Sequence, residues 1–87
     1  MMRFRAAPAE VLLGRRLGAL AAVFHRPSGQ THLLAEPAPE ILVALGDAWL
    51  TLEEVAHVLA ARYELDGAEG LAERLEELVA AGLVERQ

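Results

Sequence analysis

The spacing of the apolar residues changes at two nearby prolines, Pro37 and Pro39. Before them, short apolar runs are separated by glycine and by the turn sequence Pro27-Ser28-Gly29, a pattern typical of β-strands. After them, apolar residues recur every three or four positions, which is the spacing of amphipathic helices. We therefore expect an α+β fold in which a small antiparallel sheet is followed by helices.

Three strands are predicted before the prolines, over residues 10–17, 18–25 and 29–35, as an antiparallel meander. The turn at residues 26–29 pairs His25 with Gln30 in this prediction. Because strand side chains alternate between faces, one face is expected to hold Ala22, Phe24, Thr31 and Leu33 and to pack on the helices. The other, expected to be partly wet, holds Val23, His25, His32 and Leu34. Residues 1–9 are expected to be irregular or an edge strand.

Two of the three predicted helices have clear boundaries. The first is short, has its apolar stripe at Ile41, Leu42 and Leu45, and ends at Gly46. The second begins at the capping box Thr51-Leu52-Glu53-Glu54, in which threonine and glutamate satisfy each other's backbone amides. Its predicted buried face consists of Leu52, Val55, Ala56, Leu59 and Tyr63. Asp66-Gly67 is expected to end it.

The third helix is predicted over residues 68–81, with Gly82 as the residue that follows its end. Its apolar face is expected to hold Leu71, Leu75, Leu78 and Val79. Its opposite face is expected to hold Glu69, Glu73, Glu76 and Glu77. The closing sequence "LVER" is predicted to be a short strand or a tail. This order of elements, a three-stranded meander and then three helices, is winged-helix-like.

Composition excludes several functions. The chain has 87 residues, enough for one domain (1–87), and it contains no cysteine, which excludes disulfides and thiolate sites. Its net charge is −5, and the predicted third helix sets four glutamates against Arg74, so nucleic acid is disfavoured. A winged-helix DNA-binding or dimerisation domain, and a regulatory domain of a larger enzyme, remain as alternatives.

Several kinds of site are also not expected. His25 and His32 share a strand face but lack a third ligand, so no metal site is predicted. The sequence has no nucleophile elbow and no phosphate loop, and its acids lie on solvated helix faces, so we predict neither an enzyme nor a cofactor. The run "RRLGALAAVF" (15–24) resembles a twin-arginine signal, but its apolar stretch is short and a buried strand explains it better. No stretch is long enough to span a membrane, and a cytoplasmic location is expected.

The remaining interpretation is a peptide-binding module. The last strand of a meander leaves one edge open, and an extended peptide can add to such an edge as another strand. The third helix would lie beside it and supply side-chain pockets. The predicted peptide-binding residues are Gly29, Gln30, Thr31, His32, Leu33, Leu34, Leu71, Arg74, Leu75 and Leu78. The small core and open edges also allow a homodimer.

Three segments carry a resemblance to a known family: "VFHRPSGQTHLL" (23–34), "LTLEEVAHVLAARYEL" (50–65) and "LEELVAAGLVERQ" (75–87). Together they resemble the PqqD-like family, in particular the branch described as HPr-rel-A system peptide chaperones, over nearly all of residues 10–87. The resemblance implies a small winged-helix-like domain that binds the leader of a ribosomally made precursor peptide along the third strand, against the third helix, and presents it to a modifying enzyme. The chain departs from the family pattern at Ala35, where asparagine is usual, and at Gly46-Asp47, where the order is reversed.

Overall fold

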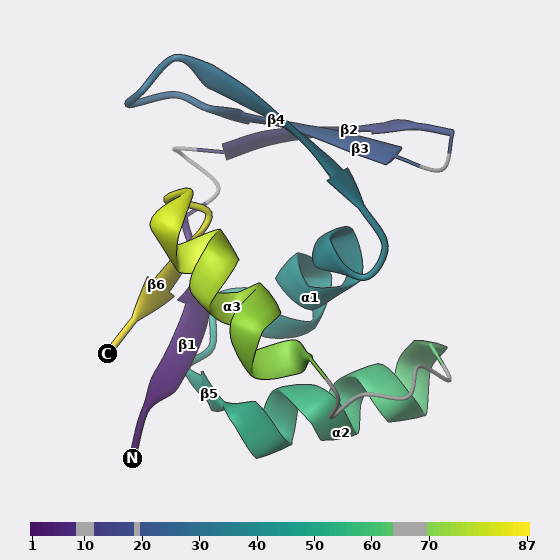
Figure 1. Cartoon of the computed structure of the whole chain (residues 1–87), viewed down its shortest axis with the longest axis vertical. Helices are drawn as coiled ribbons and strands as arrows, with labels where there is room; N and C mark the ends of the chain where they lie inside the picture. The colour runs from purple at the N-terminus through teal and green to yellow at the C-terminus, as the bar shows by residue number, and fades with distance from the viewer. Residues whose placement is uncertain (9–11, 19, 64–69) are drawn as a thin grey trace.

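The computed structural model describes residues 1–8, 12–18, 20–63 and 70–87. Within these residues the chain forms two three-stranded antiparallel sheets and three helices, so the predicted α+β class is confirmed. One sheet covers the top of the molecule in Figure 1, with α1 and α3 beneath it. The second sheet lies to one side of the helices, and both chain ends emerge there.

The upper sheet is the predicted meander. Its strands follow the order β2-β3-β4 and are β2 (Leu12–Leu17), β3 (Leu20–His25) and β4 (Gln30–Ala35). The turn pairs His25 with Gln30 and Val23 with His32, so the predicted register is confirmed. The amide of Gly29 donates to the carbonyl of His25 at 2.9 Å and closes the turn.

The prediction of which face of this sheet meets the helices is wrong. Val23 is buried and Leu34 packs against the core, whereas Leu33 is 65% exposed. The face holding His25, Val23, His32 and Leu34 therefore lies inward, and the face of Phe24, Ala22, Leu33 and Thr31 lies outward. The alternation of side chains was predicted correctly, but the more apolar of the two faces lies outward, and Phe24, the largest apolar side chain of these strands, is half-buried on it.

A second sheet was not predicted. It has the order β5-β1-β6 and consists of β1 (Arg3–Ala6), β5 (Leu50–Thr51) and β6 (Val84–Arg86). The strand predicted for "LVER" is thus confirmed, whereas β1 is a central strand and neither irregular nor at an edge. Arg5 pairs with Glu85 across β1 and β6, its Nη2 lying 2.6 Å from Oε1. Its guanidinium also covers the Trp49 ring, 4.4 Å from the ring centroid.

The helices are α1 (Ala38–Leu45), α2 (Leu52–Tyr63) and α3 (Leu71–Ala80). The capping box is present: the Thr51 amide donates to Glu54 Oε1 at 2.8 Å, and the Glu54 amide donates to Thr51 Oγ1 at 3.2 Å. The predicted break at Asp66-Gly67 and the predicted first residues of the third helix, 68 and 69, lie outside the described residues.

The end of α3 is held by two backbone bonds around Gly82. The amide of Gly82 donates to the carbonyl of Val79, and the amide of Leu83 donates to that of Leu78, each at 3.0 Å. This pattern requires a left-handed residue, and Gly82 has φ of 82°. A Cβ at this position would also lie 3.3 Å from His25 Nε2, so glycine permits the end of α3 to approach the upper sheet.

One hydrophobic core joins both sheets to all three helices. Its buried members are Phe4, Val23, Ala38, Ile41, Leu45, Val55, Leu59, Leu71, Leu75, Leu78, Leu83 and Val84. Of the face predicted for α2, Val55 and Leu59 are buried, Ala56 and Tyr63 are partly buried, and Leu52 is exposed. The core fixes α3 beneath the upper sheet, and this position sets the geometry of the candidate site.

Candidate functional site

The open edge predicted from the sequence is β4. In the described part of the chain β4 pairs with β3 alone, so one side of its backbone has no strand partner. Such an edge presents N–H and C=O groups that another extended chain can pair with. The strand contains no proline and no charged residue, features that would otherwise protect an edge from pairing.

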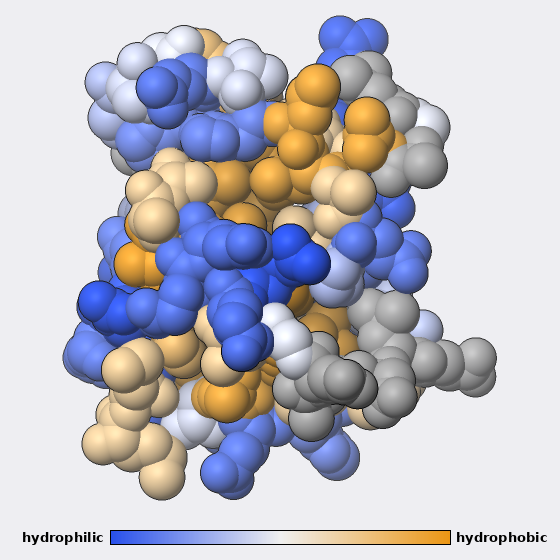
Figure 2. Space-filling model, in the orientation of Figure 1, coloured by the Kyte–Doolittle hydropathy of each residue, from blue (hydrophilic) through white to orange (hydrophobic). Residues whose placement is uncertain are grey.

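A groove of about 290 Å³ lies between the second half of β4 and α3. Residues from the strand, the corner after it and the helix line it: Leu33, Leu34, Ala35, Glu36, Ala38, Arg74, Glu77, Leu78 and Ala81. Figure 2 shows apolar atoms in the furrow between the upper sheet and the hydrophilic outer surface of α3. The structure therefore brings a free strand edge and an apolar groove together.

The predicted site residues separate into two groups around this groove. Four of them line it together: Leu33 and Leu34 from the strand, and Arg74 and Leu78 from the helix. Gly29, Gln30 and Thr31 are exposed at the turn end of β4, and His32 is half-buried on its inner face; none of the four lines the groove.

The other two predicted helix residues, Leu71 and Leu75, do not line this groove. They are 4% and 0% exposed and belong to the core. The physical reason is the rotation of the helix. Residues Arg74, Leu78 and Ala81 follow one line along α3, while Leu71 and Leu75 face the interior.

Sequence reasoning missed Glu77 on α3 and Ala81 directly after it, and it missed Glu36 and Ala38 at the corner between β4 and α1. The helical period was enough to find the first two, because they lie three and seven positions after Arg74 and so share its face. No local signal indicates Glu36 and Ala38, whose position depends on how the chain turns from β4 into α1.

The charges at the mouth of the groove are partly satisfied. Arg74 Nη1 donates to Glu77 Oε1 at 2.9 Å, and both side chains are exposed. Arg86 pairs in the same way with Glu76 on the outer surface of α3. Exposed pairs of this kind stabilise a protein by about 0–1 kcal/mol. An incoming carboxylate can therefore recruit Arg74 at a small energetic cost.

The two histidines of the hairpin share one face of the sheet, as predicted, but that face is the inner one and not the partly wet one. His25 Nδ1 lies 2.7 Å from Ser28 Oγ, which fixes the ring beside the turn. His32 Nε2 is buried and has no hydrogen-bonding partner among the described residues. Those residues contain no group of three or more histidines or carboxylates arranged to bind a metal.

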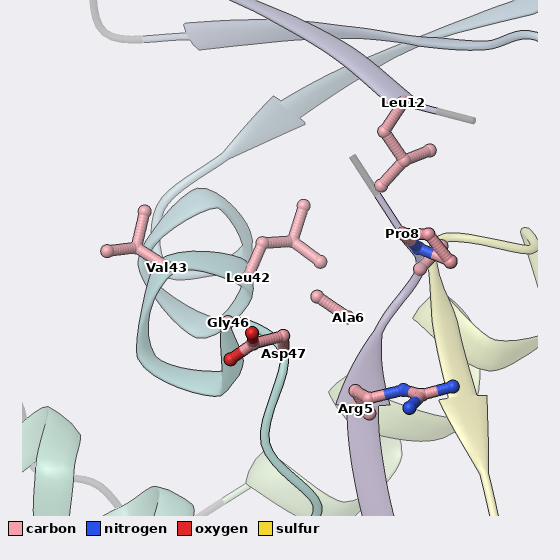
Figure 3. Close-up of a pocket in the computed structure, with 9 residues that line it drawn as sticks. Arg5, Ala6, Pro8, Leu12, Leu42, Val43, Gly46 and Asp47 are labelled. Carbon is pink, nitrogen blue, oxygen red and sulfur yellow. The ribbon is translucent and has the colours of Figure 1, made fainter. Parts of the chain in front are cut away.

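A larger cavity, of about 680 Å³, lies between α1, β1 and the start of β2. Leu12 and Leu42 point toward each other across it, with Ala6 and Pro8 on the side of β1 (Figure 3). A second cavity, of about 430 Å³, shares Leu12, Leu42 and Val43 with the first, and among its lining residues Arg16 lies 3.5 Å from Glu40. These walls are mainly aliphatic and offer apolar contact.

Comparisons with protein-family models, with curated proteins and with solved structures found no match to this chain. Nor does any helix in the described ranges have the length and apolar character needed to cross a membrane.

Proposed function

We propose that the protein is a non-catalytic peptide chaperone. An extended segment, the leader of a ribosomally synthesised precursor peptide, adds to the free edge of β4 and is presented to a modifying enzyme in the cytoplasm. One observation carries this proposal: the β4 edge runs directly beside the apolar groove on α3. The resemblance to the PqqD-like peptide chaperones implies the same mode of binding.

The two parts of the site have different roles in this proposal. The backbone of β4 supplies hydrogen bonds that do not depend on the peptide's sequence. Every second side chain of an added strand points to the same face, so alternate residues of the peptide enter the groove. Burying one aliphatic side chain there contributes roughly 1.5–3 kcal/mol, which favours leucine-like residues at those positions.

Charge also supports a peptide over DNA as the partner. The exposed surface of α3 carries Glu73, Glu76 and Glu77, which would face phosphates if the helix entered the major groove. The basic side chains nearest to them, Arg74 and Arg86, are already paired with two of these acids. A gel-shift experiment at low salt, where electrostatic affinity is greatest, tests the DNA alternative directly.

The groove can be tested by filling it. Ala81→Arg places a long side chain in the groove, whereas Ala72→Arg places the same side chain on the opposite, exposed side of α3. We expect a displayed library of random linear peptides to enrich binders on the wild-type protein and on Ala72→Arg. Ala81→Arg should bind those peptides at least about tenfold more weakly, equivalent to the loss of about 1.4 kcal/mol.

Two further variants examine the edge and the charge. Proline at Gln30 or His32 should abolish binding if the amide of that residue faces the incoming strand, because proline has no amide hydrogen. Arg74→Glu should weaken the binding of acidic peptides selectively. Enriched peptides that bind Ala81→Arg and the proline variants with unchanged affinity in calorimetry would contradict the proposal.

A further inference from the structure

The outer face of the upper sheet is apolar and uncovered. Helices α1 and α3 lie against the inner face only, and no described segment lies over the other face (Figure 1). Each strand contributes an exposed leucine there: Leu13 is 58% exposed, Leu20 39% and Leu33 65%. Phe24 and Ala22, on the central strand, are half-buried between them. Exposed apolar residues grouped in this way on one face indicate an interaction surface.

We define the outer face by the residues that share this side in the observed register: Leu13, Arg15, Leu20, Ala22, Phe24, Thr31, Leu33 and Ala35. Arg15 is its one charged member, and none of the three strands contains an acidic residue. The protein as a whole has a net charge of −5, and its described acids lie in the helices, in the loops and on β6. Two copies can therefore meet at the outer face without bringing carboxylates together.

We propose that the outer face packs against the outer face of a second copy of this chain, forming a two-fold symmetric dimer. Stacked sheets pack about 10 Å apart with interdigitated side chains, as in a β-sandwich. A two-fold interface uses the same patch on both copies, so a patch of this composition is self-compatible. Arg15 lies on the edge strand β2, where its long side chain can extend past the interface to solvent.

The size of the face is sufficient for such a dimer. Strands of six residues, rising about 3.3 Å per residue and lying about 4.8 Å apart, give a face of roughly 20 × 14 Å. Two such faces have a flat area of roughly 560 Å² together, and the relief of their side chains raises the accessible surface toward about 1,000 Å², the lower limit for a specific interface. This size predicts a reversible dimer. Face-to-face packing leaves the backbone edge of β4 free, although Leu33 and Ala35 belong both to the outer face and to the lining of the groove.

Leu13→Lys tests the proposal against a matched control, Val43→Lys. Both side chains are similarly exposed, at 58% and 61%, but Val43 lies on α1, away from the outer face. Sedimentation over a range of concentrations should show a monomer–dimer equilibrium for the wild-type protein and for Val43→Lys. Leu13→Lys should raise the dissociation constant by about 100-fold or more, because symmetry removes the leucine from both copies. Circular dichroism verifies that each variant folds.

Thiol labelling provides a second measurement, since the chain has no cysteine of its own. A cysteine replacing Thr31, an exposed residue of the outer face, should react with a thiol reagent more slowly as protein concentration rises, while one replacing Val43 should react at a constant rate. A wild-type chain that stays monomeric at every concentration would overturn the proposal. A dimer in which the Thr31→Cys thiol stays accessible, as pairing through strand edges would leave it, would overturn it equally.

Discussion

Thr51 and Glu54 determine where α2 begins. Each supplies the hydrogen-bonding partner for the other's backbone amide, at 2.8 and 3.2 Å. The hydrogen bond that the Thr51 amide donates to the Glu54 carboxyl lowers the pKa of this carboxyl below its ordinary value of 4.5. The hydrogen bond with the Thr51 side chain is the second cause and acts in the same direction. The carboxylate is therefore favoured in the folded protein. A group with a lowered pKa stabilises the fold above its unfolded pKa, and this stabilisation is lost as the pH falls through the folded pKa.

Glu54→Gln should remove this dependence on pH while keeping the cap, because glutamine also fits a capping box. We expect the wild-type protein to exceed the variant in free energy of unfolding at neutral pH. That difference should shrink progressively once the pH falls below 4.5. Urea unfolding at neutral and at acidic pH measures the free energy of unfolding of both proteins, and so gives the difference between them at each pH. Glu53→Gln is the control, since Glu53 is exposed and makes no capping bond; an equal effect of the two substitutions would refute the assignment.

Strand β4 combines three roles on three sides. Its inner face contributes Leu34 to the core, its outer face exposes Leu33, and its free edge runs along the groove. Adjacent leucines on this strand therefore have different energetic roles although their chemistry is identical. Comparing the stability effects of replacing each leucine therefore shows which face of the sheet lies against the core.

Leu34→Ala should destabilise the protein by about 2 kcal/mol, at the lower end of the range for buried leucine because the side chain is partly exposed. Leu33→Ala should change the stability by less than about 0.5 kcal/mol, since its side chain is largely exposed in the monomer. Chemical denaturation at low protein concentration tests both. The reverse order would mean that the outer and inner faces are exchanged.

The strands of the upper sheet and the helices beside it were predicted better from the sequence than which of their faces pack against the core. The turn at residues 26–29 and the capping box are local signals, and both were read correctly. Which face of the hairpin is buried depends on the helices that pack on it, and neither face of the strands is polar enough to decide. For the same reason the four helix residues predicted for the site separate: Arg74 and Leu78 line the groove, while Leu71 and Leu75 face the core.

For the whole molecule, the decisive contact is between segments at opposite ends of the sequence. β1 pairs with β5 on one side and with β6 on the other, and Phe4 from β1 is 4% exposed in the common core. This pairing was not foreseen because a four-residue strand whose one large apolar side chain lies between two arginines has no distinct pattern of its own. Pairing of β1 with residues about eighty positions away leaves no local trace in the sequence.

Phe4→Ala should therefore cost about 3–5 kcal/mol, the usual effect of removing a buried phenylalanine. Since small domains have a total stability of roughly 5–15 kcal/mol, we expect the variant to be severely destabilised. Thermal unfolding followed by circular dichroism measures the loss. Met2→Ala, at a neighbouring position that is 50% exposed, should leave the melting temperature nearly unchanged. A similar effect from both would show that β1 contributes little to the fold.

The central position of β1 has a consequence for biosynthesis. A ribosome makes Arg3–Ala6 early but reaches Val84–Arg86 only after nearly all of the other described residues. Until that late segment leaves the exit tunnel, β1 lacks one of its two neighbours and Phe4 lacks part of its covering. The hairpin of β3 and β4 can form by local pairing during translation, whereas the sheet around β1 can close only after Val84–Arg86 has been made.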